Sequence, residues 1–118
     1  MDEGRPIFLQ LAEAIEEGIL DGTYAEETQI PSTTEFAAFH RINPATALKG
    51  ITRLVDAGVL YKKRGIGMFV ADGARAALIA ARRATFHDDF IGPPRAEARA
   101  LGISDDELAE MIRKDTSS

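Results

Sequence analysis

The 118-residue sequence contains no cysteine and only two histidines. Without thiols the chain can form neither disulfides nor thiolate metal sites, which suits a reducing, cytoplasmic location. His40 and His87 have no partner at metal-ligand spacing, so we expect no metal and no other cofactor. The sequence also lacks an apolar run of about eighteen residues, so no membrane span is expected. Its polar, acidic beginning does not resemble a signal peptide.

A catalytic constellation is also missing. No nucleophile is paired with a base, and Asp88 and Asp89 are interpreted as solvated surface. Gly65 and Gly67 lie between two predicted strands, whereas a phosphate-binding glycine loop lies between a strand and a helix. We therefore do not expect an enzyme.

Charge is unevenly distributed along the chain. The net charge of −5 at first argues against a nucleic-acid partner. Residues 30–70, however, carry six basic and two acidic side chains, whereas residues 1–29 carry one basic and eight acidic side chains. A solvated face would explain the basic middle taken alone, so its interpretation depends on the motifs that it contains.

The first half of the chain predicts three helices. Apolar residues recur every four positions from Ile7 to Ile19, which predicts an amphipathic helix that ends before Gly22. A Ser-x-x-Glu capping box predicts a short helix from Ser32 to about His40. Asn43, followed by a proline suited to the first helical turn, predicts a third helix that Gly58 ends.

A hairpin and further helices are expected after the third helix. Residues 59–61 and 68–70 read as two strands joined by a basic, glycine-containing turn. An alanine-rich helix is predicted from residue 74 to about residue 90, and residues 92–94 are expected to break it. A second helix is predicted over about residues 94–101. A capping box at Ser104 and Glu107 predicts a third helix after it.

The order of these elements predicts a mainly α fold with a small β-hairpin, a winged helix-turn-helix domain followed by a short C-terminal helical dimerisation tail. The second helix of a helix-turn-helix fits the DNA major groove, since both are about 10–12 Å wide. Helix N-termini and small hydroxyl groups favour phosphate, and a basic turn can approach the backbone closely. The predicted DNA-binding residues are Ser32, Thr33, Thr34, Asn43, Ala45, Thr46, Lys49, Arg53, Lys63, Arg64, Gly65, Ile66 and Gly67.

The apolar residues are divided between a core and an exposed tail surface. We expect Phe36, Phe39, Ile51, Leu54 and Phe69 to be core residues rather than base-stacking ones. Two apolar faces in the tail would need a second copy of the chain to cover them, which predicts a twofold homodimer. Such a dimer places recognition helices roughly 34–36 Å apart and requires a near-palindromic site. The predicted dimerisation residues are Ile79, Phe86, Phe90, Leu108, Met111 and Ile112.

Five motifs in order resemble the GntR-type winged helix, strongly over residues 5–71 and loosely over residues 74–113. The Asn-Pro-x-Thr start of the third helix and the short C-terminus are similar to its YtrA-type branch. The motifs are Pro6-Ile7-x-x-Gln10-Leu11, Ile30-Pro31-Ser32-x-x-Glu35-Phe36-Ala37, Asn43-Pro44-x-Thr46, Arg53-Leu54-x-x-x-Gly58-Val59-Leu60 and Arg64-Gly65-x-Gly67-x-Phe69-Val70.

The resemblance implies an operator-binding dimer that mostly represses transcription, with residues 1–72 as the DNA-binding domain and residues 73–118 as the dimerisation region. It implies DNA contacts from Thr34, Asn43, Thr46, Lys49 and the turn at residues 64–67. The short tail implies little room for a large ligand pocket, which leaves a small-molecule effector undefined.

The chain also departs from this pattern. Arginine is common in relatives at the positions of Thr34 and Ile66, a usual threonine is replaced by Met68, and His40-Arg41 replaces a commoner apolar-glycine turn. These departures predict a less cationic interface. The alternative function is a winged-helix module for protein–protein interaction, which would explain the net acidity but not the cations on the third helix and turn.

Overall fold

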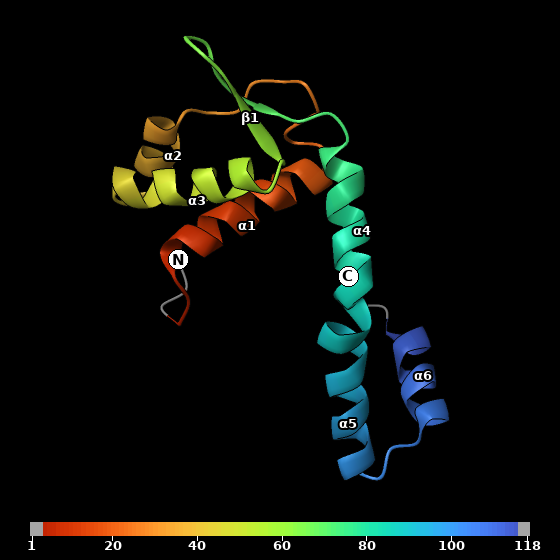
Figure 1. The fold of residues 1–118 in the computed structure, drawn as a ribbon. Helices are drawn as coiled ribbons and strands as arrows, with labels where there is room; N and C mark the ends of the chain where they lie inside the picture. Colours follow the sequence, from red (N-terminus) through yellow and green to blue (C-terminus); the bar gives the residue numbers. More distant parts are fainter. Residues whose placement is uncertain (1–3, 116–118) are drawn as a thin grey trace. The chain divides into compact units, whose positions relative to one another are not determined.

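The computed structural model describes residues 4–115. Figure 1 shows three helices followed by a two-stranded hairpin and a further run of helices. The contacts divide the chain into a first unit that ends at Ile79 and a second unit that begins at Ala80. The elements are α1 (Ile7–Leu20), α2 (Thr33–His40), α3 (Pro44–Asp56), β1 (Leu60–Lys63), β2 (Gly67–Val70), α4 (Ala74–Phe86), the π-helix η1 (His87–Ile91), α5 (Gly92–Ala100) and α6 (Asp105–Lys114). This confirms the predicted winged-helix architecture.

The starts of α2 and α3 follow from local hydrogen bonds. Ser32 Oγ accepts the Glu35 backbone N–H at 3.1 Å, and Glu35 Oε1 accepts the Ser32 backbone N–H at 3.0 Å. This is the predicted capping box, and the hydrogen bond from the Ser32 backbone lowers the pKa of Glu35. Asn43 Oδ1 accepts the Ala45 N–H at 2.7 Å, with Pro44 in the first turn of α3. Both predicted helix starts are confirmed.

The core of the first unit lies between the three helices and the hairpin. α1 crosses α3 so closely that a Cβ added at Gly50 would lie 2.7 Å from the Phe8 carbonyl oxygen. A side chain at this position would force the two helices apart. The largest fully buried side chains are Leu11, Ile15, Ile19, Ile51, Leu60 and Val70.

One residue that was expected in the core is exposed. Phe36 is buried, but Phe39 is 83% exposed. Successive residues of a helix are about 100° apart, and Phe36 and Ala37 set the buried side of α2 at an angle that Phe39 does not share. Ile51 and Leu54 are buried and Phe69 is half-buried, so the prediction of a core position is wrong for Phe39.

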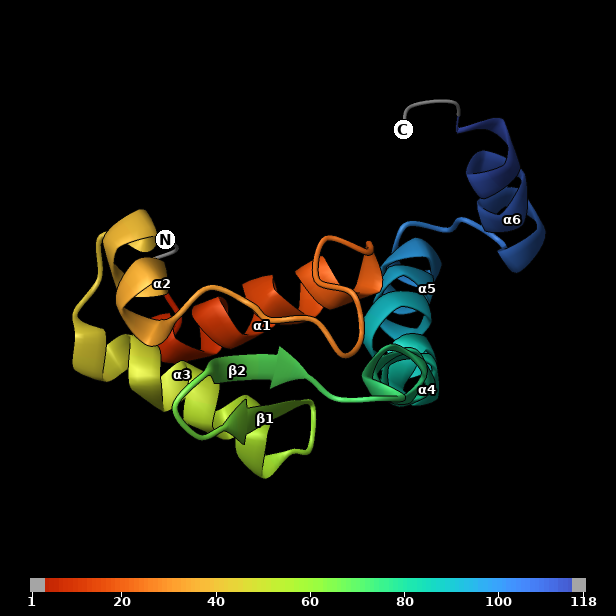
Figure 2. The same ribbon diagram turned by 90° about the horizontal axis from the view of Figure 1, so that it is seen from above.

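A third segment of the chain pairs with the two strands of the hairpin. β1 and β2 pair antiparallel, with Leu60 opposite Val70 and Lys62 opposite Met68. The segment before α2 runs alongside β2 (Figure 2). The Ile30 N–H donates to the Met68 carbonyl oxygen at 2.9 Å, and the Val70 N–H donates to that of Thr28 at 3.1 Å. This pairing ties the hairpin to the segment that leads into α2.

The same segment also holds the beginning of α4. The Glu26 carboxylate accepts the backbone N–H groups of Gly73 at 2.8 Å and Arg75 at 3.1 Å. These hydrogen bonds, that of Gly73 first, lower the pKa of Glu26. The Arg75 side chain in turn donates from Nε to the Leu20 carbonyl oxygen at 3.0 Å. Glu26 therefore caps α4 from a position far away in the sequence.

The helices of the second unit differ from the prediction at residues 92–94. Gly92 has helical dihedral angles (φ −57°, ψ −56°), and the following prolines lie in the first turn of α5. A new helix therefore begins close to the expected position, but the chain stays helical there and no non-helical break separates η1 from α5. The π-helix η1 precedes Gly92. The wider turn of η1 changes the hydrogen-bond pattern just before Pro93 and Pro94, which lack a backbone N–H.

α5 and α6 pack against each other within the second unit. The Arg95 guanidinium donates to both carboxylate oxygens of Asp105, at 3.1 and 2.7 Å, and this interaction lowers the pKa of Asp105. The predicted start of α6 is confirmed, since Ser104 Oγ accepts the Glu107 N–H at 3.1 Å. The Glu107 carboxylate, however, accepts the Ser104 hydroxyl rather than its backbone N–H.

Candidate nucleic-acid interface

A groove of about 480 Å³ runs between α2, α3 and the hairpin. The beginning of α2 supplies hydroxyl groups to its wall, the exposed side of α3 supplies a leucine and a threonine, and the hairpin supplies a lysine and an isoleucine. Five of the predicted DNA-binding residues meet here, namely Ser32, Thr33, Thr34, Ile66 and Gly67. Lys62, from the predicted basic turn, lines the same groove, as do residues that were not predicted, namely Gln29, Ile30, Leu48, Ile51, Thr52, Val55 and Met68.

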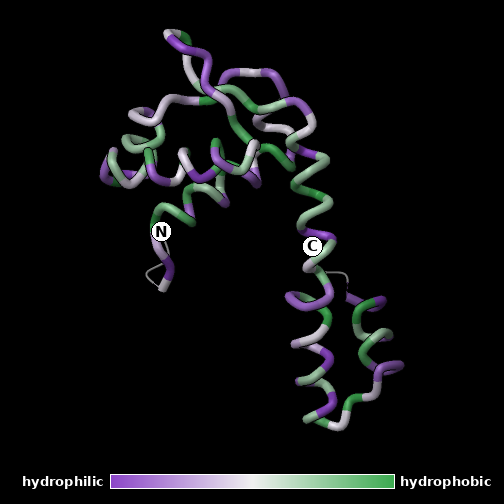
Figure 3. Tube along the Cα trace, viewed as in Figure 1, coloured by the Kyte–Doolittle hydropathy of each residue, from purple (hydrophilic) through white to green (hydrophobic). Residues whose placement is uncertain are grey.

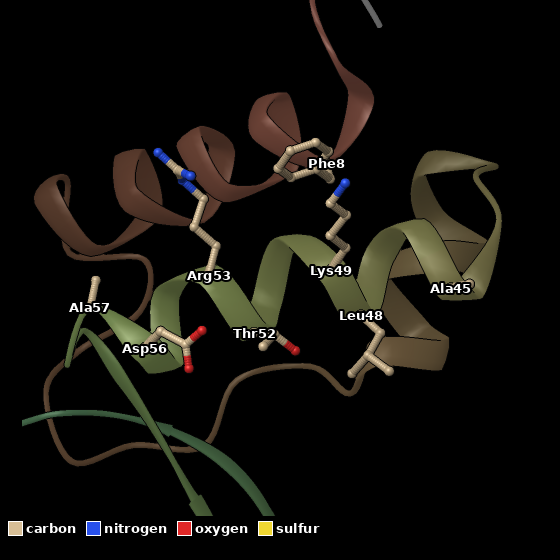
Figure 4. Close-up of a pocket in the computed structure, with 8 residues that line it drawn as sticks. All are labelled: Phe8, Ala45, Leu48, Lys49, Thr52, Arg53, Asp56 and Ala57. Atoms are coloured by element: carbon tan, nitrogen blue, oxygen red, sulfur yellow. The ribbon is translucent and has the colours of Figure 1, made fainter.

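The two basic residues of α3 lie outside this groove. In Figure 4, Lys49 and Arg53 point toward α1, whereas Leu48 and Thr52 point away from it. Lys49 Nζ lies 4.1 Å from the centroid of the Phe8 ring, a cation–π contact. Lys49 and Arg53 line a shallow hollow between α3 and the start of α1 instead. α3 therefore presents Lys49 and Arg53 on the side of α1, and Leu48, Thr52 and the acidic Asp56 on the other side.

The two lysines of β1 lie on opposite faces of the hairpin. Side chains alternate across a strand, and Lys62 shares the face of buried Leu60, which turns toward the groove. Lys63 lies on the other face, where Nζ is 4.3 Å from the Phe69 ring centroid. Both lysines belong to the basic turn that the sequence predicts to contact DNA, and alternation from Leu60 would have separated Lys62 from Lys63.

The turn of the hairpin is held in place by the loop before α2. Gly65 has a φ of 78°, and the Ile66 N–H donates to the Lys63 carbonyl oxygen at 2.9 Å. Gln29 Nε2 donates to the Ile66 carbonyl oxygen at 3.0 Å, and a Cβ at Gly67 would collide with this amide. Gln29 lies in a segment without periodicity, so no sequence signal identified it.

Three consecutive basic residues lie at the end of this hairpin. The hydrophilic stretch that leads to the turn is visible in Figure 3 and comprises Lys62, Lys63 and Arg64. Arg64 is exposed, and Ile66 beside it is 62% exposed. At the base of the hairpin, the Tyr61 hydroxyl donates to Glu27 at 2.7 Å, which raises the pKa of Tyr61.

The remaining predicted contact residues lie at the start of α3. Asn43 and Ala45 are exposed there, and Thr46 is half-buried. The side-chain oxygen of Asn43 is already used by the helix cap, so this residue mainly positions the helix. The N-terminal end of α3 presents backbone N–H groups, which favour a negatively charged partner such as a phosphate.

The tail residues predicted to form a dimer are largely exposed. Phe86 and Phe90 lie together with ring centroids 5.5 Å apart. Met111 and Ile112 are exposed on α6, while Ile79 and Leu108 are half-buried. Leu101 and Ile91 are further exposed apolar residues that the prediction missed.

Two other features are absent from residues 4–115. Within that range, no group of three histidine, aspartate or glutamate side chains could hold a metal ion. None of the described helices is long and apolar enough to cross a membrane.

Residues 8–70 match the family of bacterial regulatory proteins known as the gntR family. The chain belongs to the GntR family. A GntR-family protein from Bacteroides thetaiotaomicron has a crystal structure similar to this one, with a TM-score of 0.74 and 37% sequence identity over 92% of this chain and 94% of that chain. The family match spans the three helices and the hairpin that form the groove.

Two further proteins are similar over somewhat more than half of the chain. The structure of AraR(DBD) in complex with operator ORX1 has a TM-score of 0.55 and 32% identity, and it covers 60% of this chain and 87% of that chain. The HTH-type transcriptional repressor NagR of Bacillus subtilis is 32% identical over 66 residues, which is 56% of this chain. The aligned part is 27% of NagR, so this chain spans about a quarter of that relative's length.

Proposed function

We propose that this GntR-family protein is a sequence-specific DNA-binding transcriptional regulator and not an enzyme. The observation that carries the proposal is the groove in which the start of α2, the side of α3 and the hairpin lysine Lys62 meet. The likeness to AraR(DBD), whose structure contains an operator, supports a DNA partner. A protein-binding winged helix remains the competing function, and the experiments below distinguish the two.

In the proposed complex, α3 lies in the major groove with its exposed side toward the bases. Thr33 and Thr34 donate hydroxyl hydrogen bonds to phosphates, while Lys49 and Arg53 contact the backbone from the α1 side of α3. The turn with Arg64 and Gly65 lies against the backbone beside the minor groove. The row formed by Leu48 and Thr52 is left to contact base edges.

The test is the salt dependence of binding to duplexes selected from a random-sequence library. Neutralised phosphates release counterions, so affinity should fall steeply with salt. Arg64→Ala and Lys49→Ala should each weaken binding to all duplexes and lower the salt slope by about one. Arg83→Ala is the matched control, because it removes an exposed cation from the second unit. If no duplex binds at low salt, the protein-interaction function is favoured instead.

We further propose that the chain is a cytoplasmic homodimer that acts as a repressor at a near-palindromic operator and belongs to the YtrA-like branch. Residues 1–72 would bind DNA and residues 73–118 would pair two subunits. Exposed Phe90, Met111 and Ile112 support this, because their apolar surface is covered by nothing in the described chain.

Light scattering tests the dimer. The wild type should have twice the chain mass at micromolar concentration, and Ile112→Asp should have the mass of a monomer. Phe39→Asp is the matched control, since Phe39 is even more exposed but lies on α2. A monomeric wild type would refute the proposed assembly.

A further inference from the structure

The row of α3 that faces the groove contains an exposed leucine. Leu48 is 53% exposed and points away from α1 (Figure 4). Its neighbours one turn away on the same side are Ala45 and Thr52, which carry no charge, and the acidic Asp56 follows one turn beyond Thr52. The cations of α3 occupy the adjacent row instead. An apolar side chain therefore lies at the centre of the surface that we assign to base contacts.

The surroundings of Leu48 argue for a nucleic-acid partner rather than an apolar one. The same groove contains the hydroxyl-bearing residues Thr34 and Thr52 and the ammonium-bearing Lys62. Within residues 30–70 basic side chains outnumber acidic ones. A protein partner with a hydrophobic helix would have to bury these polar groups without their water, which is costly.

The major groove offers a leucine one apolar group. Of the four bases, only thymine presents a methyl group there, at C5, whereas cytosine, adenine and guanine present polar edges. A leucine against those edges would displace the water that hydrogen-bonds to the base donors and acceptors, and it offers no hydrogen bond in return.

We propose that Leu48 recognises a thymine in each half-site through its C5 methyl group and is thereby a specificity-determining residue. This inference rests on the proposed function, because it requires α3 to lie in the major groove. Thymine is favoured over cytosine at this position by the gain of an apolar contact. It also accounts for the uncharged Leu48 and Thr52 on the side of α3 that faces away from its two cations.

The experiment removes the methyl group and nothing else. Duplexes are selected from a random library with the wild type, and each thymine of the recovered site is replaced singly by deoxyuridine. Base pairing and phosphate charge are unchanged, so the salt slope should stay the same. One replacement per half-site should weaken binding about fourfold, the effect of burying one methyl-sized group.

Variants of Leu48 complete the thermodynamic cycle. Leu48→Ala changes both subunits, so it should bind the thymine site about as weakly as the wild type binds a site with uracil in both half-sites, and it should not distinguish thymine from uracil. Leu48→Met should restore the distinction. Thr52→Ala is the matched variant, which should retain the full uracil penalty whatever its own affinity. Circular dichroism should show unchanged folding, because Leu48 is outside the buried core.

Two results would overturn the inference, and they are distinguishable. If every uracil replacement leaves wild-type affinity unchanged, or if the penalty persists in Leu48→Ala, the leucine reads no methyl group while DNA binding stands. If no duplex is retained at low salt, DNA binding and this inference fall together.

Discussion

Replacing Gly50 by alanine should destabilise the protein, although alanine is the better helix former. Gly50 is buried in α3, and a Cβ there would lie 2.7 Å from the Phe8 carbonyl oxygen and 3.5 Å from Leu11 Cδ2. The first of these atoms belongs to the backbone of α1, so no side-chain rotation can relieve the contact. The two helices must separate, and the core between them loses packing.

Two opposing effects set the magnitude. Alanine in place of a helical glycine gains about 1 kcal/mol of helix propensity. Overpacking of a well-packed core costs about 1–3 kcal/mol, and a backbone collision belongs to the upper part of that range. The net loss should be about 1–2 kcal/mol, which for a domain of this size lowers Tm by about 5–15 °C.

Thermal unfolding followed by circular dichroism measures this change. Thr52→Ala, on the exposed side of the same helix, is the matched control and should raise stability by about 0.5 kcal/mol through propensity alone. An unchanged or higher Tm for Gly50→Ala would refute the close crossing of α1 and α3. Such a result would also show that the approach of the α1 backbone does not require glycine at position 50.

Two further changes test the contacts that hold the first unit together. Glu26→Gln should lower Tm at neutral pH, because a carboxylate caps α4 better than an amide does. The pKa of Glu26 is lowered by the N–H groups of Gly73 and Arg75, so its stabilisation is present above the ordinary glutamate pKa and is lost as pH falls through the lowered value. The difference in Tm between the two proteins should therefore shrink below about pH 4; a constant difference would contradict the capping role. Arg41→Gly should raise stability by about 0.5–1 kcal/mol in urea unfolding, because Arg41 has a left-handed φ of 55° that glycine adopts without strain. A lower urea midpoint would show that the arginine side chain stabilises this turn.

Helix boundaries were predictable where the signal is local. The Ser32–Glu35 capping box and the Asn43-Pro44 start depend on hydrogen bonds within a few residues, and the structure contains both. At residues 92–94 the expected helix boundary is present but the helical conformation is not interrupted, because glycine and proline are tolerated in the first turn of α5.

The candidate groove was predictable only in part. The sequence placed Thr34 and the turn at residues 64–67 near one another through the expected fold, but it did not separate Lys62 from Lys63. It assigned Phe39 to the core because the residue is apolar, whereas the short α2 exposes it. No sequence signal identified Gln29, although its side-chain amide donates a hydrogen bond to the Ile66 carbonyl oxygen.

The order of amino acids alone determined the helices, the hairpin and the kind of domain, because caps, turns and hydrophobic periods act over a few neighbouring residues. Tertiary structure decided which side of each element is free. The crossing of α1 over α3 at Gly50 places Lys49 against Phe8 and leaves Leu48 facing the groove. Two residues adjacent in sequence acquire different surroundings, since a helix turns them by about 100° and only its packing partners fix which direction is covered.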